Sequence, residues 1–467
     1  MVKNYFFMLT TLLFRMLGNV FIFLILAKYL NAADFGLFIY VFTLALLLAI
    51  IVDYGFPLKL YRDLSKGKGD FDTLIHDSYN VKVLLSVGLS LVAVIIYVFS
   101  DISFYFYFIV IFAAVINSFC IFYTIPLRAV ENFKLDTLIS VVGNGALFIL
   151  VMMALYLNGS IEAIATAIFI SRLFNLIFVR KCLARYMNTL PSILKFPINR
   201  MPLDVFRSNF PFAIHLAVGT LYIQLDTIII RNILGDIDVG IYQSAFRIFL
   251  GLLIFSEVLN NIYIPRLAKF SESVSSLLTE SKMMYRYLLL LGAVISLSLF
   301  SSADVLVAIL YGQANPDIIL LVKLFTVALL FRYISSVNAT LLTISDKQKI
   351  RVISVSIVLS ISIVLNLLII PIYGIMGAGV IVVVSSILLS ISYELLTVFT
   401  YKRTFLTYDV LISFFILLIG YGLLYVFNYY FALDLLIRIV SSVSVLLITF
   451  VVMAQVLKIK FKDVRLS

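Results

Sequence analysis

The chain has 467 residues, of which 63% are hydrophobic and only 13% are charged, and its mean hydropathy is +1.15. A soluble domain carries about a quarter charged residues, so this composition excludes a water-soluble fold and indicates a multi-pass membrane protein. The net charge of +11 is expected at the membrane surface beside anionic lipid headgroups, and the soluble basic face that nucleic-acid binding would need is absent.

Apolar windows of about 20 residues, the length that crosses a bilayer as a helix, follow one another along the chain. They number fourteen, and they are apolar on nearly every side, unlike the alternating strands of a membrane β-barrel. We therefore predict an all-α protein with 14 transmembrane helices. The windows begin near Tyr5, Gly36, Asn80, Ser103, Leu135, Ile161, Asn209, Val239, Met284, Asp317, Ile350, Met376, Val410 and Leu433.

The distribution of charge between the windows predicts the orientation. Most of the 35 Lys and Arg residues lie before the first window, in every second gap, or in the C-terminal tail. The other gaps hold mainly acids, and Lys28 and Arg231 are their basic exceptions. By the positive-inside rule, the basic gaps and both termini face the cytoplasm.

An internal repeat relates the two halves of the chain. Residues Tyr29–Tyr40 align without a gap with Ile233–Ser244, at an offset of 204 residues. Each stretch lies between the first and second spans of a six-span series, which is the signature of a duplicated unit. The matched positions are Leu30 with Leu234, Asp34 with Asp238, Gly36 with Gly240 and, more weakly and at a larger offset, Gly159 with Gly374.

The repeat predicts two lobes. Because six spans return the chain to the same side of the membrane, the lobes are expected to be parallel, related by an axis along the membrane normal and separated by a central cleft. The N-terminal six-helix lobe is residues 1–185, and the C-terminal lobe is residues 208–403. Residues 186–207 form a basic, proline-containing cytoplasmic linker. Residues 404–467 hold helices 13 and 14, expected at the periphery, and a basic cytoplasmic tail.

Five stretches of the sequence resemble a known family. The segments LAKYLNAADFGLFIY, DYGFPLKLYRDLS, IPLRAVENFK, QLDTIIIRNILGDIDVGIYQSAFRI and IPIYGIMGAGVIVVVSS are similar to polysaccharide transporters of the Wzx type, the O-antigen flippases of the multidrug/oligosaccharidyl-lipid/polysaccharide superfamily. The resemblance implies translocation of undecaprenyl-pyrophosphate-linked oligosaccharide, an intermediate of lipopolysaccharide assembly, across the bacterial inner membrane by alternating access. It implies membrane lipids and other polysaccharide-assembly proteins as partners.

Charged residues inside spans are the candidate functional residues, because a charge costs about 2.5 to 3.5 kcal/mol at the centre of a membrane helix and so faces a cavity or a partner. Guanidinium groups suit a pyrophosphate, since they form bidentate hydrogen bonds and stay charged. In the resembling family the first and eighth helices line the cleft. Each arginine could instead snorkel or pair with a buried acid. The predicted substrate-binding residues are Arg15, Asn19, Arg172, Arg247 and Arg332.

Acids and one histidine within the spans could carry a coupling proton or sodium ion. His215 and Asp226 share one stripe of the seventh span, and the histidine could titrate near neutrality. The alternatives are packing for His215, an interlobe hydrogen bond for Asp226, and capping or pairing with a base for Asp53. The predicted ion-coupling residues are Asp53, His215, Asp226, Glu257 and Glu394.

Two other functions stay open at this stage. A cation-coupled multidrug exporter of the same superfamily would typically have twelve spans and fewer cleft arginines. A polymerase or ligase of lipid-linked sugars would need catalytic groups in a sizeable outer loop, whereas the longest outer gap runs only from about Ser302 to Asn315. We therefore expect a transporter and not an enzyme, with no cofactor and no metal site.

Overall fold

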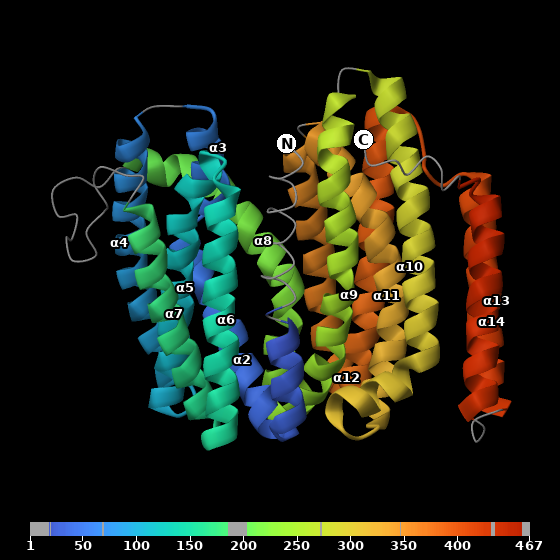
Figure 1. Cartoon of the computed structure of the whole chain (residues 1–467), viewed down its shortest axis with the longest axis horizontal. Helices are drawn as coiled ribbons and strands as arrows, with labels where there is room; N and C mark the ends of the chain where they lie inside the picture. Colours follow the sequence, from blue (N-terminus) through green and yellow to red (C-terminus); the bar gives the residue numbers. More distant parts are fainter. Residues whose placement is uncertain are drawn as a thin grey trace. The chain divides into compact units, whose positions relative to one another are not determined.

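The computed structural model is built from helices (Figure 1), and it describes residues 18, 20–67, 70–184, 203–270, 273–345, 347–430 and 435–459. No strand occurs in these ranges, so the all-α prediction is confirmed. The helices are α2 (Ala32–Asp53), α3 (Phe56–Ser65), α4 (Phe71–Val98), α5 (Phe104–Ala129), α6 (Phe133–Leu157), α7 (Ile161–Leu183), α8 (Leu203–Leu234), α9 (Asp236–Lys269), α10 (Val274–Tyr311), α11 (Pro316–Ile344), α12 (Gln348–Tyr401), α13 (Tyr408–Tyr430) and α14 (Leu435–Val456).

Side chains before the helices fix where several of them begin. Asn31 accepts a hydrogen bond from the backbone N–H of Asp34 at the start of α2, and Ser160 accepts one from Ala163 at the start of α7. These contacts satisfy N–H groups that the first helical turn leaves without a partner. Asp70 caps α4 in the same way, and its hydrogen bonds from Thr73 lower the pKa of the Asp70 carboxyl.

Helix α12 is too long to cross the membrane once. Its 54 residues would extend about 80 Å as one straight helix, against about 30 Å of hydrocarbon. The chain bends at Gly374, whose φ of 60° and ψ of −149° lie outside the helical region and suit only glycine. The helix therefore contains two spans. Gly159, its weak repeat partner in the sequence, also has a positive φ, of 68°.

Eleven helices of the described residues are long and apolar enough to span a membrane. Residues 1–17 and residue 19, which belong to the first predicted span, lie outside the described residues. The described part of this span, the apolar helix Val20–Tyr29, is too short to cross a membrane by itself. The multi-pass architecture is confirmed, and the count of fourteen stays a prediction.

The chain divides into two compact units, which we call unit 1 (Met1–Gly240) and unit 2 (Ile241–Ser467). Within unit 1, α8 packs against α2, α3 and α4, so the first helix of the second repeat belongs to the first compact unit. The predicted lobe boundaries around residues 186–207 stay predictions.

Helices α13 and α14 pack against each other and against α10, on one side of the bundle of unit 2 (Figure 1). The contact is partly polar, since the Ser301 hydroxyl of α10 donates to Ser442 of α14 at 2.6 Å. Tyr421 of α13 reaches Ser296 of α10 at 2.7 Å and Thr326 of α11 at 3.3 Å. This is the peripheral attachment expected of helices that have no counterpart in the repeat.

Candidate functional site

Of the predicted substrate-binding residues, Arg172 is the arginine whose charge stays uncompensated. It lies midway along α7 and is half-buried, and its guanidinium forms no ion pair with any residue in the described ranges. Three residues further along the same helix, Asn175 is 9% exposed, and its side-chain oxygen accepts no hydrogen bond from the part of the chain that the structure describes. An unneutralised guanidinium beside an unsatisfied amide is an arrangement that an anionic, hydroxyl-bearing ligand would complete.

Arg247 is enclosed in unit 2. Its side chain is 6% exposed on α9, where Gln243 is buried one turn before it. Tyr311 of α10 donates from its hydroxyl to the backbone oxygen of Ser244 at 2.8 Å, one turn before Arg247. The arginine therefore does not face acyl chains. Arg332 lies half-buried on α11, while Arg15 and Asn19 lie outside the described residues.

A charged cluster occupies the interior of unit 1. The Lys82 ammonium is 0% exposed, and it donates to Asp53 Oδ1 at 3.0 Å and to the hydroxyl of Ser118. The same hydroxyl donates to Asp53, and the ammonium lies over the rings of Phe119 and Phe122. Asp53 thus has a resident counter-ion, as the pairing alternative anticipated.

Sequence reasoning missed Lys82 as a membrane-buried group. The hydropathy window of this span begins near Asn80, and charge sorting counts Lys82, only two residues later, with the bases of the preceding cytoplasmic gap. The helix begins earlier, at Phe71, so Lys82 lies inside α4. Hydropathy alone cannot distinguish a lysine that is buried against a carboxylate from one at a span end, because the partner lies on another helix.

Glu394 is held by neutral donors. Its carboxylate accepts hydrogen bonds from Asn338 Nδ2 at 2.8 Å, from the Thr404 hydroxyl at 2.6 Å and from the backbone N–H of Phe405 at 2.7 Å. Asn338 in turn accepts from Thr397 at 3.0 Å. These bonds join α11, the end of α12 and the turn before α13. The carboxylate has a structural function, and its coupling function stays a prediction.

Glu257 differs from both of these acids. It lies midway along α9 with an exposed side chain, and its carboxylate makes no hydrogen bond or ion pair with a residue that the structure describes. His215 and Asp226 are half-buried on α8, and each makes a contact of its own. Asp53, His215 and Asp226 belong to unit 1, whereas Glu257 and Glu394 belong to unit 2. Glu257 is the carboxylate among them that a cation would most plainly stabilise.

The repeated motif forms a close helix crossing within unit 1. A Cβ atom on Gly36 of α2 would lie 1.7 Å from the backbone oxygen of Asp236, and one on Gly240 of α9 would lie 2.1 Å from the backbone oxygen of Ala32. The two contacts are reciprocal, because the offset of 204 residues pairs Ala32 with Asp236 and Gly36 with Gly240. Only glycine permits this approach, so the repeat is visible as an approximate two-fold contact.

Arg231 joins three elements next to this crossing. Its guanidinium, at the end of α8, donates to Asp101 at 2.6 Å and to Asp236 at 3.2 Å, and it lies over the ring of Tyr40 at 4.8 Å. The hydrogen bond from Arg231 lowers the pKa of Asp101, which lies in the connection between α4 and α5. Charge sorting marked Arg231 only as an exception to the positive-inside pattern. The structure explains it by its two acidic partners.

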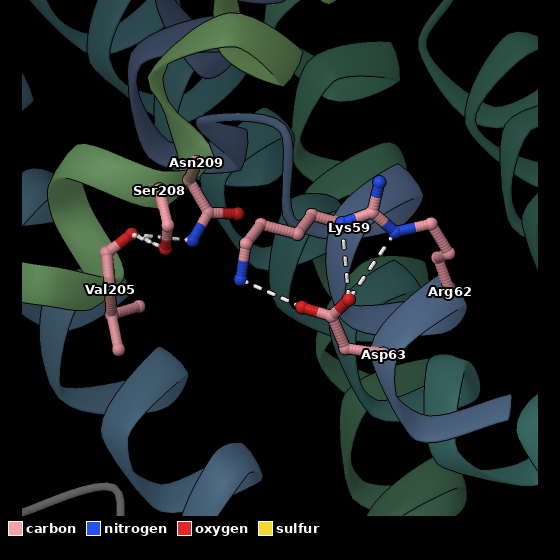
Figure 2. A network of polar contacts seen from close by, with 6 residues as sticks. All are labelled: Lys59, Arg62, Asp63, Val205, Ser208 and Asn209. Atoms are coloured by element: carbon pink, nitrogen blue, oxygen red, sulfur yellow. Dashed lines mark hydrogen bonds and ion pairs between the residues drawn. The ribbon is translucent and has the colours of Figure 1, made fainter. Parts of the chain in front are cut away.

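Figure 2 shows a second polar network of unit 1, between α3 and the start of α8. Lys59 donates to Asp63 at 2.8 Å, and Arg62 binds the same carboxylate at 3.2 Å, so two bases share one acid. The Arg62 guanidinium also lies 4.8 Å from the ring centroid of Phe212 on α8. On the same side of α8, Asn209 donates to the backbone oxygen of Val205 at 2.7 Å. The network keeps one net positive charge near the predicted cytoplasmic surface.

No group of three or more His, Cys, Asp or Glu side chains that could hold a metal ion occurs among the residues for which coordinates are described. The candidate functional residues are membrane-embedded charges in each unit: Arg172 in unit 1, and Arg247 with Glu257, an acid without a described partner, in unit 2. These charges lie on helices α7 and α9.

The fold is shared with solved membrane transporters. The lipid II flippase MurJ in an inward closed conformation matches with a TM-score of 0.69 and 16% identity, over 97% of this chain and 100% of that one. An inward-facing multidrug resistance transporter of the MATE family matches with a TM-score of 0.64 and 14% identity, over 84% of this chain and 94% of that one. The protein is thus an all-helical, multi-pass membrane protein with the fold that these transporters share.

The sequence comparison then gives the family. The profile of the family described as "Polysaccharide biosynthesis protein" matches residues 1–271, more than half of the chain, and the protein belongs to this family. An uncharacterized membrane protein of Methanocaldococcus jannaschii is 25% identical over 409 residues, 83% of this chain and 94% of the relative. The capsular polysaccharide biosynthesis protein CapF of Staphylococcus aureus is 24% identical over 208 residues, 43% of this chain and 50% of that protein. The family resemblance seen in the sequence is confirmed.

Proposed function

We propose that this protein is a flippase that moves an undecaprenyl-pyrophosphate-linked oligosaccharide, an O-antigen or similar repeat unit, from the cytoplasmic to the outer leaflet of the inner membrane by alternating access. Membership of a polysaccharide biosynthesis family supports the pathway, and the fold shared with MurJ supports transport of a large lipid-linked substrate. Both termini face the cytoplasm in this proposal, and the two six-helix lobes enclose the cleft.

The observation that carries the proposal is Arg172. A guanidinium in mid-membrane that forms no ion pair with a described residue is costly unless an anion visits it. The pyrophosphate of the lipid carrier is such an anion, and the planar fork of arginine matches its oxygens. Arg15, Asn19, Arg247 and Arg332 complete the proposed path of the headgroup. Because no step of translocation breaks a covalent bond, these residues need only bind and release, and the protein is not an enzyme in this proposal.

The test measures translocation in proteoliposomes that contain undecaprenyl-pyrophosphate-linked oligosaccharide with a labelled sugar. Arg172→Ala is expected to slow translocation about tenfold or more, since a charge-assisted hydrogen bond contributes about 1.5 to 3 kcal/mol, and Arg172→Lys is expected to recover part of the rate. The matched control is Arg180→Ala on the same helix, where the arginine donates to the Tyr123 hydroxyl. This variant is expected to keep the translocation rate of the wild type. Equal rates for wild type and Arg172→Ala would contradict the proposal.

A cation-coupled multidrug exporter is the second candidate, because the MATE transporter shares the fold. An unneutralised guanidinium in the pathway repels cationic drugs and favours an anion. Uptake of a cationic dye by inverted vesicles, measured in parallel, separates the two functions. Dye transport without movement of the lipid-linked sugar would favour the exporter.

A further inference from the structure

Two turns of unit 2 lie side by side at the membrane surface. One joins α11 to α12, and the other joins α12 to α13. The hydroxyls of Ser345 in the first turn and Tyr401 before the second are hydrogen-bonded to each other. Next to them, Arg351 of α12 donates to Thr343 Oγ1 of α11 at 2.9 Å and to the Tyr393 hydroxyl at 3.4 Å. These contacts hold the start of α12 against its own C-terminal half.

Five basic side chains gather on these two turns. Four of them are exposed, and they form no ion pair with any residue for which the structure gives a position. Arg351 is half-buried, and because its partners are hydroxyls, they leave its charge unbalanced. Five bases against two neighbouring acids, the buried Glu394 and Asp346, which lies outside the described residues, leave three net positive charges. The group that we call the basic patch consists of Lys347, Lys349, Arg351, Lys402 and Arg403.

The backbone of the second turn is held in one conformation. Lys402 has a φ of 54°, in the left-handed region where the end of a helix commonly carries glycine. The residues that follow bond to Glu394, through the Thr404 hydroxyl at 2.6 Å and the backbone N–H of Phe405 at 2.7 Å. A non-glycine residue in this conformation is strained, and such strain concentrates at ligand-binding positions. The turn therefore keeps Lys402 and Arg403 at the surface although glycine would suit its backbone better.

Apolar side chains beside the basic patch place it at the level of the lipid headgroups. Ile350, Leu406 and Tyr408 are 40%, 42% and 76% exposed. The two connections have only three and six residues, and the helices on either side are long enough to span a membrane. The bases thus lie where the spans leave the hydrocarbon, on the side that the positive-inside pattern assigns to the cytoplasm. At this depth basic side chains reach phosphates while apolar ones contact acyl chains.

We propose that the basic patch binds the phosphate headgroup of an anionic phospholipid of the cytoplasmic leaflet, of which phosphatidylglycerol is the probe. Ammonium and guanidinium groups from both turns donate charge-assisted hydrogen bonds to its phosphate oxygens. Ile350, Leu406 and Tyr408 contact its acyl chains. A lipid bound there bridges α11, α12 and α13, so it fastens the peripheral pair α13 and α14 to the bundle of unit 2. The site concerns a lipid of the surrounding membrane and does not depend on the transported substrate.

The test titrates the purified full-length protein in detergent with phosphatidylglycerol and, separately, with phosphatidylcholine, and native mass spectrometry counts the bound lipids. The wild type is expected to bind phosphatidylglycerol more tightly. Lys402→Gln with Arg403→Gln is expected to raise the dissociation constant for phosphatidylglycerol at least about tenfold, since each base at an anionic surface contributes about a fivefold factor. The constant for phosphatidylcholine should not change. The matched control is Lys134→Gln with Lys181→Gln, which removes two exposed bases from unit 1 and should keep the wild-type constants.

A second variant separates lipid binding from folding. Glycine adopts the left-handed conformation without strain, so Lys402→Gly is expected to keep or raise the thermal midpoint in phosphatidylcholine nanodiscs. Its dissociation constant for phosphatidylglycerol should rise about fivefold. If the double variant does not fold, Lys402→Gly decides. A wild type without preference for phosphatidylglycerol overturns the proposal. An equal loss of affinity in the control pair also overturns it, because positive charge anywhere on the cytoplasmic surface would then suffice.

Discussion

The two units treat their membrane-embedded acids differently. In unit 1, Asp53 is neutralised by Lys82, and Asp136 on α6 binds Arg128 at 3.1 Å. In unit 2, Glu394 is satisfied by neutral donors and Glu257 has no described partner. A resident base fixes the charge of an acid, whereas an acid without one can exchange its cation. The comparison distinguishes Asp53 and Asp136, whose charges the protein neutralises itself, from Glu257, whose carboxylate has no described partner.

The largest expected effect comes from removing the resident base of unit 1. Lys82→Ala leaves the Asp53 carboxylate without its counter-ion, and breaking one side of a buried pair costs about 3 to 5 kcal/mol. The free energy of unfolding, measured by reversible denaturation in mixed micelles, is expected to fall by that amount. The double variant Asp53→Asn with Lys82→Met keeps the volume and removes both charges, so it is expected to recover most of the loss. If the single and double variants lose the same free energy of unfolding, Lys82 does not stabilise the protein by neutralising Asp53, and the contrast between the two units fails.

Replacing the anchored acid of unit 2 should have a smaller effect. Glu394→Ala leaves the buried donors of Asn338 and Phe405 without an acceptor, and we expect a loss of about 3 kcal/mol in the free energy of unfolding. Because the hydrogen bonds to Glu394 come from neutral groups, no second substitution that removes a basic residue should recover the stability lost in Glu394→Ala. Hydrogen exchange of the turn at residues 402–407 measures the local effect, since its N–H groups should exchange faster. An unchanged exchange rate would show that the carboxylate does not hold this turn.

The sequence could predict what local patterns encode. Hydropathy predicted the multi-pass helical architecture, and the repeat matched Gly36 with Gly240. The structure then shows that two helices come into backbone contact at these positions. The pairing of charges could not be predicted in the same way. Lys82 looks like a loop charge by hydropathy, and the partners of Glu394 at Thr404 and Phe405 lie in a turn that has no pattern of its own. Such contacts depend on how helices pack, and hydropathy does not report packing.

What the two halves share can be tested at their glycine crossing. Gly36→Ala and Gly240→Ala each place a methyl group against a backbone oxygen, and overpacking of this kind costs about 1 to 3 kcal/mol. Because the contacts are reciprocal, the two variants should be destabilised to a similar extent, near 2 kcal/mol. Gly145→Ala is the control, since a methyl group there meets no atom within 4 Å and should stabilise α6 by about 0.5 to 1 kcal/mol. A large effect at one glycine only would show that the crossing is asymmetric.

The smallest expected effect is the acid dependence of the Arg231 contact. The hydrogen bond from Arg231 lowers the pKa of Asp101 below its ordinary 3.8, so this contact contributes stability above that value and loses it as pH falls through the lowered pKa. The Asp101 side chain is 74% exposed, which limits the contribution to about 1 kcal/mol or less. Comparing the wild type with Asp101→Asn between pH 6 and pH 3 isolates it. The two stabilities should differ at pH 6 and converge on acidification, because protonation removes the charge that the asparagine already lacks. A difference that is as large at pH 3 as at pH 6 would mean that Asp101 acts through packing, and the ion pair would then contribute nothing to holding α8 against the connection between α4 and α5.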